Sequence, residues 1–315
     1  MNLRNLIAAV VGAACMALAP ACYAQGQRAR PLKIVVPYPP GGIADSLARA
    51  IATPLGVALE RPVIVDNRAG AAGTVGAAHV KAAEPNGSTL LFTNVGPSAI
   101  APAMSKSPLY DPTKDFVAVS LVSRSPGFKD LSELIAAAKA KPGSIEYSSA
   151  GIGSFGHLAT VLFAKIVGIE LLHVPYQGGG PATTAVLAGE VKLSLTAPSA
   201  QMFEMAKDGR VRLLGVSSHG ASILAPGVAP ISNVVPEFEA EYWFGFVAPA
   251  KTPDATVQML YQAIDKILAD PAIEKQFLGM GNEVARMPPA EFQRLIYSEA
   301  QRWRSVVKDA KVEAN

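Results

Sequence analysis

The chain has 315 residues, of which 50% are hydrophobic and 17% are charged, a composition that excludes a disordered protein. This length is sufficient for two globular lobes that each bury a core. The formal net charge is only +3 and no run of Lys or Arg forms a basic stripe, so nucleic acids and anionic membrane surfaces are poor candidate partners.

The first 24 residues form a segment of their own. Arg4 supplies a positive charge, residues 6–19 are apolar, and Cys22-Tyr23-Ala24 is an acceptable cleavage site. The pattern predicts a cleaved signal peptide over residues 1–24. A membrane anchor and a lipoprotein signal are the alternatives. The apolar run is short for a transmembrane span, and the residues before Cys22 match a lipobox motif poorly. Both cysteines lie in this segment, so cleavage would leave an exported chain without thiols.

The stretch from Ile34 to Leu47 predicts a strand, a loop and the start of a helix. A β-branched run ends in two prolines and two glycines at residues 39–42, and a helical pattern follows at once. Prolines stiffen such a turn, and glycines leave its backbone N–H groups accessible to a ligand. Asp45 or Ser46 is expected to cap the helix. A glycine loop at a helix N-terminus favours an anionic group.

The helix after this loop has one apolar face. Leu47, Ile51 and Leu55 recur at four-residue spacing and predict the side that packs on the core. Pro54 lies within the pattern and is expected to kink the helix or to end its first segment.

Strand and helix patterns then alternate, which predicts an α/β protein with largely parallel sheets. Strands are expected over residues 63–65 and 89–93, with a helix over 74–83 between them. The loops after these strands, residues 66–73 and 94–98, are small and polar, like the first loop. Because parallel strands end at the same edge of a sheet, the three loops are expected to line one crevice.

Residues 111–128 are rich in proline and serine and are taken as the crossing into a second lobe. Within that lobe, strands are predicted over residues 145–148, 171–174, 191–195 and 211–216, and helices over residues 129–141, 154–167 and 182–188. Residues 244–247 are predicted to be the return crossing, followed by three helical stretches. The predicted division is 25–124 for the first lobe, 125–241 for the second, and 242–315 for the return crossing and C-terminal helices, which pack on both lobes.

Residues 151–156 (GIGSFG) fit the G-x-G-x-x-G pattern between a predicted strand and a predicted helix. A dinucleotide site also needs an acid at the end of the next strand. Glu170 instead precedes that strand, and Val174-Pro175-Tyr176 ends it. We therefore favour a carboxylate at these glycines, bound by the mechanism proposed for the first loop.

No motif for catalysis or for a resident metal is found. The sequence lacks a G-x-S-x-G elbow and an H-E-x-x-H pair, and none of its four histidines has a partner at metal-ligand spacing. His157 either faces the cleft or is a capping or core histidine. A cap is favoured over a general base for Asp45. Tyr38 and Tyr176 follow strands, and serve either as packing residues or as walls for a slender organic acid.

Five stretches, in order, are residues 36–42 (VPYPPGG), 65–70 (VDNRAG), 110–116 (YDPTKDF), 173–179 (HVPYQGG) and 243–249 (WFGFVAP). They resemble the signature stretches of the Bug receptor family, the periplasmic solute-binding proteins of tripartite tricarboxylate transporters. The resemblance covers the whole mature chain. It implies a two-lobe periplasmic-binding-protein fold, a type II-like Venus flytrap, that closes around a small carboxylate.

The resemblance also implies which residues contact the ligand. Loops matching residues 38–45 and 151–157 face each other across the cleft in the family and bind a carboxylate through backbone amides and ordered water. The expected contacts in the first lobe are Tyr38, Pro40, Gly41, Gly42, Ile43, Asp45, Asn94, Gly96, Pro97 and Ser98. Those in the second lobe are Gly153, Ser154, Phe155, His157, Tyr176, Thr196 and Ala197.

The implied function is that of a periplasmic, non-enzymatic and monomeric receptor without cofactor, which delivers its ligand to the membrane subunits of the transporter. The alternative is a receptor that reports the ligand to a two-component signalling system. This chain lacks the strand and turn that relatives carry before Lys129, so its lobe crossing is expected to be altered. Thr196 stands where many relatives have Asp, which favours a plain carboxylate over an amino acid.

Overall fold

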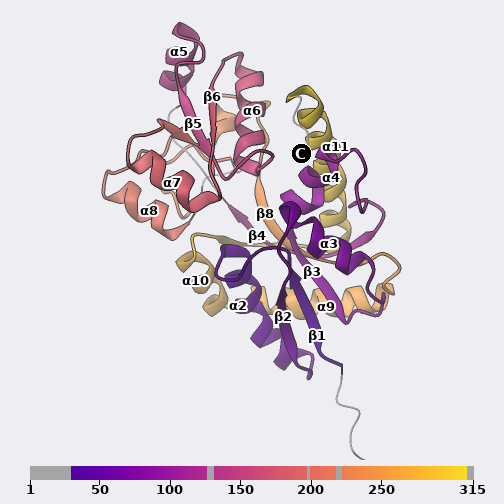
Figure 1. Cartoon of the computed structure of the whole chain (residues 1–315). Helices are drawn as coiled ribbons and strands as arrows, with labels where there is room; N and C mark the ends of the chain where they lie inside the picture. The colour runs from indigo at the N-terminus through magenta and orange to yellow at the C-terminus, as the bar shows by residue number, and fades with distance from the viewer. Residues whose placement is uncertain (1–29, 126–130, 197–198, 218–221, 311–315) are drawn as a thin grey trace, which may run out of the picture.

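The computed structural model describes residues 30–125, 131–196, 199–217 and 222–310, which fold into an α/β structure with two sheets (Figure 1). The predicted signal peptide, the shortened crossing after Ser125 and the expected ligand contact Ala197 lie outside the described residues. In the described part of the chain, no helix is both long and apolar enough to cross a lipid bilayer.

The larger sheet has strands from both ends of the chain. Its order is β2 (Val63–Asn67), β1 (Leu32–Val36), β3 (Thr89–Asn94), β8 (Tyr242–Pro249), β4 (Phe116–Ser125) and β9 (Glu283–Met287). β1 is parallel to β2 and β3, whereas β8 is antiparallel to β3 and β4, and β9 is antiparallel to β4. The expectation of largely parallel sheets is therefore wrong for this sheet. The chain leaves along β4 and returns along β8, so these two strands run in opposite directions.

Helices cover both faces of this sheet. They are α2 (Ile43–Ala58), α3 (Thr74–Lys81), α9 (Asp254–Leu268), α10 (Pro271–Gly279) and α11 (Pro289–Ala310), with the short segments η1 (Ala71–Gly73), η2 (Gly96–Ile100) and α4 (Ala101–Met104). Strand residues alternate between the two faces. Ile34 packs in the core with α2, α9 and α10, while Val35 packs in the core with α3 and α11.

Helix α2 has the buried face that its sequence predicts, because Leu47, Ile51 and Leu55 are fully buried. Of the two alternatives predicted for Pro54, an end of the first segment is wrong, since the helix continues through Pro54 to Ala58. Proline removes one amide from the helical ladder, at a cost of about 3 kcal/mol. The packing of the apolar face against the sheet stabilises the helix in spite of this loss.

The smaller sheet is fully parallel and lies apart from the larger one (Figure 1). Its strands, in order, are β6 (Leu172–Pro175), β5 (Glu146–Ser149) and β7 (Leu193–Ser194), and the surrounding helices are α5 (Ser132–Ala140), α6 (Phe155–Val167), α7 (Gly179–Leu187), α8 (Ala200–Lys207) and η3 (Ile231–Asn233). The predicted strand over residues 211–216 is wrong: within the described ranges this segment belongs to no named strand, and its Val216 forms an isolated bridge with Pro230. Residues of this segment and of β7 line one cavity.

The part of the chain around the smaller sheet contacts the rest on two sides. On one side α11 lies along α6 (Figure 1), where the Phe155 ring packs edge-on against Trp303 at 5.8 Å and against Tyr242 at 5.0 Å. On the other side, Glu283 at the start of β9 accepts hydrogen bonds from the Ile223 amide, at 3.0 Å, and from the Ser222 hydroxyl. The crossing strands β4 and β8 run between these two contacts.

Replacing Gly245 by Ala should destabilise the larger sheet. A Cβ on Gly245 would lie 2.3 Å from Cζ of Phe292 and 2.9 Å from the carbonyl oxygen of Ser120. Overpacking of this kind costs about 1–3 kcal/mol, measured as the free energy of unfolding in urea. Gly279→Ala is the control, because no atom lies within 4 Å of its added Cβ. Equal stability of the two variants would show that β8 and α11 are not tightly packed.

Candidate functional site

The loops that follow β1, β2 and β3 meet at the carboxyl edge of the larger sheet, as expected for parallel strands. A Cβ on Gly73, in the second loop, would lie 2.5 Å from Pro97 in the third loop and 3.4 Å from Pro37 in the first. A Cβ on Gly96 would lie 3.1 Å from the Tyr38 hydroxyl. Because Gly73 and Gly96 have no side chain, the three loops can approach one another this closely.

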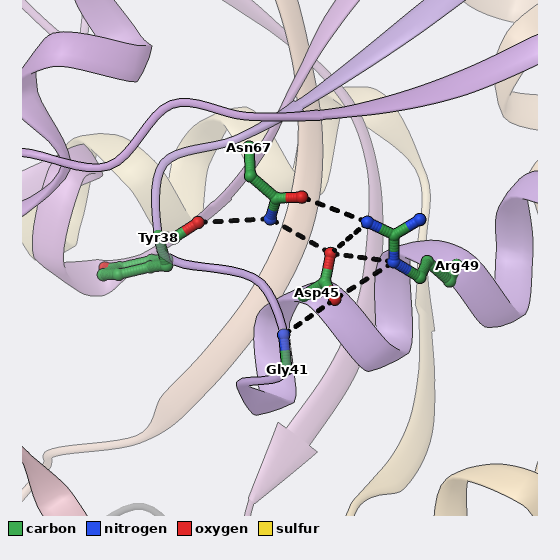
Figure 2. Close-up of polar contacts among 5 residues, drawn as sticks. All are labelled: Tyr38, Gly41, Asp45, Arg49 and Asn67. Carbon is green, nitrogen blue, oxygen red and sulfur yellow. Dashed lines mark hydrogen bonds and ion pairs between the residues drawn. The ribbon is translucent and has the colours of Figure 1, made fainter.

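The carboxylate of Asp45 organises the first loop (Figure 2). It accepts hydrogen bonds from the Gly41 amide, the Asn67 side-chain amide and Nε of Arg49, each at 3.0 Å. Asn67 also donates to the Tyr38 carbonyl, at 3.2 Å. The Asp45 side chain therefore connects the first loop, the end of β2 and the first turn of α2.

Asp45 is buried and carries a negative charge. Burial by itself raises the pKa of Asp45, but the hydrogen bonds from Arg49, Gly41 and Asn67 outweigh it and hold the pKa below its usual range. The expectation that Asp45 or Ser46 caps α2 is wrong, because the helix begins at Ile43 and its N-cap is Gly42. Asp45 lies in the first turn and reaches back to Gly41, so it shapes the loop as an ionised hydrogen-bond acceptor.

The first loop keeps open amides in spite of this network. The Gly41 amide donates its hydrogen bond to the Asp45 carboxylate. The amides of Gly42, Ile43 and Ala44 donate to no other described residue. First-turn amides have no partner within their own helix. Pro40, Gly41 and Gly42 are exposed, so a ligand can reach this loop.

The third loop is held by a chain of polar side chains. The Tyr38 hydroxyl donates to Oδ1 of Asn94, and Nδ2 of Asn94 donates to the Tyr242 hydroxyl, each at 3.0 Å. Burial raises the pKa of Tyr38 well above its usual value, although the bond to Asn94 opposes this shift. The Ser98 hydroxyl is buried and bonds to Thr93 at 2.8 Å. Tyr38 and Asn94 thus lie together at the edge of the sheet, whereas the buried Ser98 hydroxyl is already hydrogen-bonded to Thr93.

In the second lobe, the loop after β5 is held by a neutral histidine. Ser154 caps α6 by accepting the His157 amide at 3.3 Å, and Nδ1 of His157 accepts the Gly153 amide at 3.0 Å. The imidazole stacks on His173 with ring centroids 4.0 Å apart. His157 is thus a buried capping histidine, the second of the two alternatives given by its sequence position. Burial, and then the neighbouring His173, lower the pKa of His157 to about 4.

The other expected contacts of the second lobe lie in different surroundings. Phe155 is 8% exposed and its side chain belongs to the core, but its amide and that of Ile152 donate to no other described residue. The Tyr176 hydroxyl donates to Glu190 at 3.2 Å. Thr196 lines a separate cavity of about 400 Å³ beside the open edge of β7, which also contains Lys192 and Arg210. In the loop after β5, the open backbone amides of Ile152 and Phe155, rather than side chains, are therefore the groups available to an anion.

A cavity of about 410 Å³ lies between the two parts of the chain. Residues on its walls include Ala71, Ala72, Thr74, Met104 and Tyr110 from one side and Ile152 and Gly153 from the other. Of the expected ligand contacts that the structure describes, only Gly153 lines it. The loop over residues 66–73 is marked in the sequence by its small residues, but nothing in the sequence singles out Met104. A Cβ on Gly153, at φ +74°, would lie 2.4 Å from the Met104 sulfur, so Met104 reaches the loop of the other lobe.

Backbone strain marks the same cavity. Ala71 and Ala72 both have positive φ, at 46° and 53°. This conformation costs a non-glycine residue about 1–2 kcal/mol, and such residues cluster at functional sites.

In the described ranges, no group of three or more His, Cys, Asp or Glu side chains is placed to hold a metal ion.

The chain was compared with protein families and solved structures. The family model described as tripartite tricarboxylate transporter family receptor matches residues 47–312. The protein BugT of Bordetella pertussis is 32% identical over 321 residues, covering 98% of each chain. The R. palustris protein Rpa4515, solved with adipate, has a TM-score of 0.78 and 28% identity, covering 91% of this chain and 99% of its own. MatC of Rhodopseudomonas palustris, solved with bound malate, has a TM-score of 0.74 and 27% identity, covering 89% and 99%.

Replacing Asp45 by Asn should destabilise the protein at neutral pH. The variant loses charged hydrogen bonds worth about 1–3 kcal/mol. Because the folded state lowers the pKa of Asp45, its stabilisation is present above the usual pKa of 3.8 and is lost as pH falls through the lower, folded value. Urea unfolding from pH 7 to 2 should show the two proteins converging at the acid end. Glu204→Gln, which removes an exposed partner of Lys207, should change little. A constant difference across this pH range would contradict an ionised Asp45.

Replacing His157 by Asn should reduce the pH dependence of the free energy of unfolding between pH 6.5 and 4. The folded state holds His157 neutral with a pKa of about 4 against 6.5, so only the unfolded chain gains a proton between these values. Wild-type stability should therefore fall by on the order of 3 kcal/mol as pH drops from 6.5 to 4. The Asn oxygen can still accept the Gly153 amide but does not titrate. Urea unfolding tests this, and equal slopes in both proteins would rule out His157 as the source.

Proposed function

This chain belongs to the family of tripartite tricarboxylate transporter receptors, and from that premise we propose that it captures a small carboxylate between its two lobes and delivers it to the membrane subunits of a tripartite tricarboxylate-type transporter. The observation that carries the proposal is a pair of glycine loops, one in each lobe, whose open amides lie at the starts of α2 and α6.

Both loops are suited to an anion for the same physical reason. Backbone amides at a helix N-terminus are unpaired within the helix, and the helix dipole favours a negative charge there. The first turn of α6 contains no acidic residue. The first turn of α2 contains Asp45, but its charge is compensated by Arg49. A carboxylate has two oxygens and can accept hydrogen bonds from amides of both loops at once.

Ligand binding at two lobes also gives a mechanism for signalling occupancy. A carboxylate held by both loops stabilises the closed arrangement relative to the open one, which shifts the population towards closure. The crossing strands β4 and β8 would act as the hinge, with α11 as the element that packs on both lobes. The membrane subunits would then recognise the closed receptor.

The family and its structural neighbours are binding proteins rather than enzymes, and the groups of this site agree with that role. Asp45 is engaged by Arg49 and Asn67, and His157 is engaged by Gly153, so neither is positioned as a free base. The predicted signal peptide and the periplasmic neighbours support a location in the periplasm.

Replacing Gly42 by Val should weaken carboxylate binding by about tenfold or more while the fold is kept. Gly42 has φ −79°, which any residue adopts, and its added Cβ would approach only the Pro39 carbonyl, at 3.8 Å. The branched side chain would shield the loop amides from the ligand. A thermal-shift panel of carboxylates, amino acids and nucleotides identifies the ligand class, and calorimetry then compares the affinities.

The matched control is Gly279→Val, the same substitution in α10, which contributes no residue to either loop and where no atom lies within 4 Å of the added Cβ. It should bind as the wild type does. Unchanged affinity of the Gly42 variant would exclude the first loop as a carboxylate site. Failure of every carboxylate to bind the folded wild-type protein would overturn the proposed function.

A further inference from the structure

We propose that the ligand is a monocarboxylate with an apolar body, and that this body occupies the cavity between the lobes while the carboxylate meets the loop amides. The inference rests on the proposed function and adds to it the class of ligand. The lining of this cavity holds no charged side chain, its Tyr110 and Ser105 hydroxyls are already paired, and the cavity lies beside the open amides of the second lobe.

The walls of the cavity are uncharged and mostly apolar, with Thr74, Ser105, Ser107 and Tyr110 as their polar residues. Of the described residues that line it, none is Asp, Glu, Lys, Arg or His. Lys106 lies in sequence between the lining residues Ser105 and Ser107 but is not itself a lining residue. Lys81 donates to the Leu109 carbonyl and forms an ion pair with Asp115, each at 3.0 Å. A second carboxylate in this cavity would therefore lose its hydration without gaining a cation, which is strongly unfavourable.

Two of the polar groups on the walls are already paired. The Tyr110 hydroxyl donates to the Pro97 carbonyl at 2.6 Å. The Ser105 hydroxyl accepts the Ser107 amide at 3.2 Å. These contacts reduce the number of donors that could stabilise a second carboxylate, while methylene groups would pack against Ala101, Pro102 and Met104.

The cavity is adjacent to the proposed anion site. Ile152 and Gly153 line it, and the open amides of Ile152 and Phe155 belong to the same loop. Ile152 and Leu109 are 59% and 63% exposed, so they form an apolar rim with one residue from each lobe. A volume of about 410 Å³ is within the usual range for small-molecule sites, roughly 300–1,000 Å³. This volume has room for the chain of an acid of roughly six to ten carbons whose carboxylate lies at the loop.

The test compares hexanoate with adipate, which have the same chain length and differ in the second carboxylate. Calorimetry on the mature protein should give at least about tenfold tighter binding of hexanoate. Affinity should also rise about fourfold for each added methylene from butyrate to octanoate. Tighter binding of adipate, or no gain with chain length, would overturn the inference but leave a carboxylate receptor in place. If no carboxylate binds, the proposed function fails as well.

A charge placed in the cavity should reverse the preference. Ala101 lines the cavity with helical φ and ψ of −59° and −43°, so longer side chains fit its backbone. Ala101→Lys should raise the affinity for adipate relative to hexanoate by about tenfold or more, because the ammonium group pairs with the second carboxylate. Ala101→Met has a side chain of similar length without charge and should not do so. If both variants behave alike, the ligand body does not lie in this cavity.

A second control separates this cavity from the cationic cavity beside β7. Arg210→Ala removes a charge from that cavity alone and should leave hexanoate affinity within about twofold of wild type. Loss of binding in this variant would place the acid beside β7 and overturn the inference. Circular dichroism of each variant confirms that the fold is retained before affinities are compared.

Discussion

The buried carboxylate of Asp45 is the interaction on which the first half of the candidate site depends. A charge in the interior is tolerated only when hydrogen bonds and an opposite charge compensate its lost hydration. Asp45 obtains these from Gly41, Arg49 and Asn67, which belong to the loop after β1, to α2 and to the end of β2. The compensation of one charge therefore fixes the positions of three separate elements. The amides left open beside it are consequently presented in one defined geometry.

The second lobe fixes its own glycine loop without a charge. There the Gly153 amide donates a hydrogen bond to the neutral imidazole of His157. Burial and the stacked ring of His173 keep this imidazole neutral. The two loops thus have different electrostatic surroundings, a compensated anion in one and an uncharged base in the other. An incoming carboxylate meets no acidic residue in the first turn of α6. The neutral loop beside an uncharged cavity is the more suitable of the two for an acid with an apolar body.

The arrangement of strands gives the two loops their relation to each other. β4 and β8 are adjacent and antiparallel in the larger sheet and lead to and from the smaller sheet. The proposed rotation about this pair would change the distance between the loops. Met104 and Ile152 line the cavity from opposite lobes, so their separation would change with this rotation.

The sequence by itself determined the elements whose signal is local. The four-residue spacing of Leu47, Ile51 and Leu55 identified the buried face of α2, and the glycine and proline runs located the loops after the strands. The resemblance of ordered motifs along the chain identified the family, which the family model and BugT confirm. These features depend on neighbours in the chain or on stretches that can be matched one by one.

Only the tertiary structure decided the features that join distant parts of the chain. Asn67 meets Asp45 across 22 positions, and Met104 meets Gly153 from another lobe. β4 is a ten-residue strand because β8 and β9 flank it, whereas the proline and serine of residues 111–128 predicted only a crossing into the second lobe. Residues 211–216 have the pattern of a strand but no adjacent ladder partner. The physical reason is common to all four cases: hydrogen-bond partners and packing surfaces are set by three-dimensional proximity, which the local pattern of side chains does not encode.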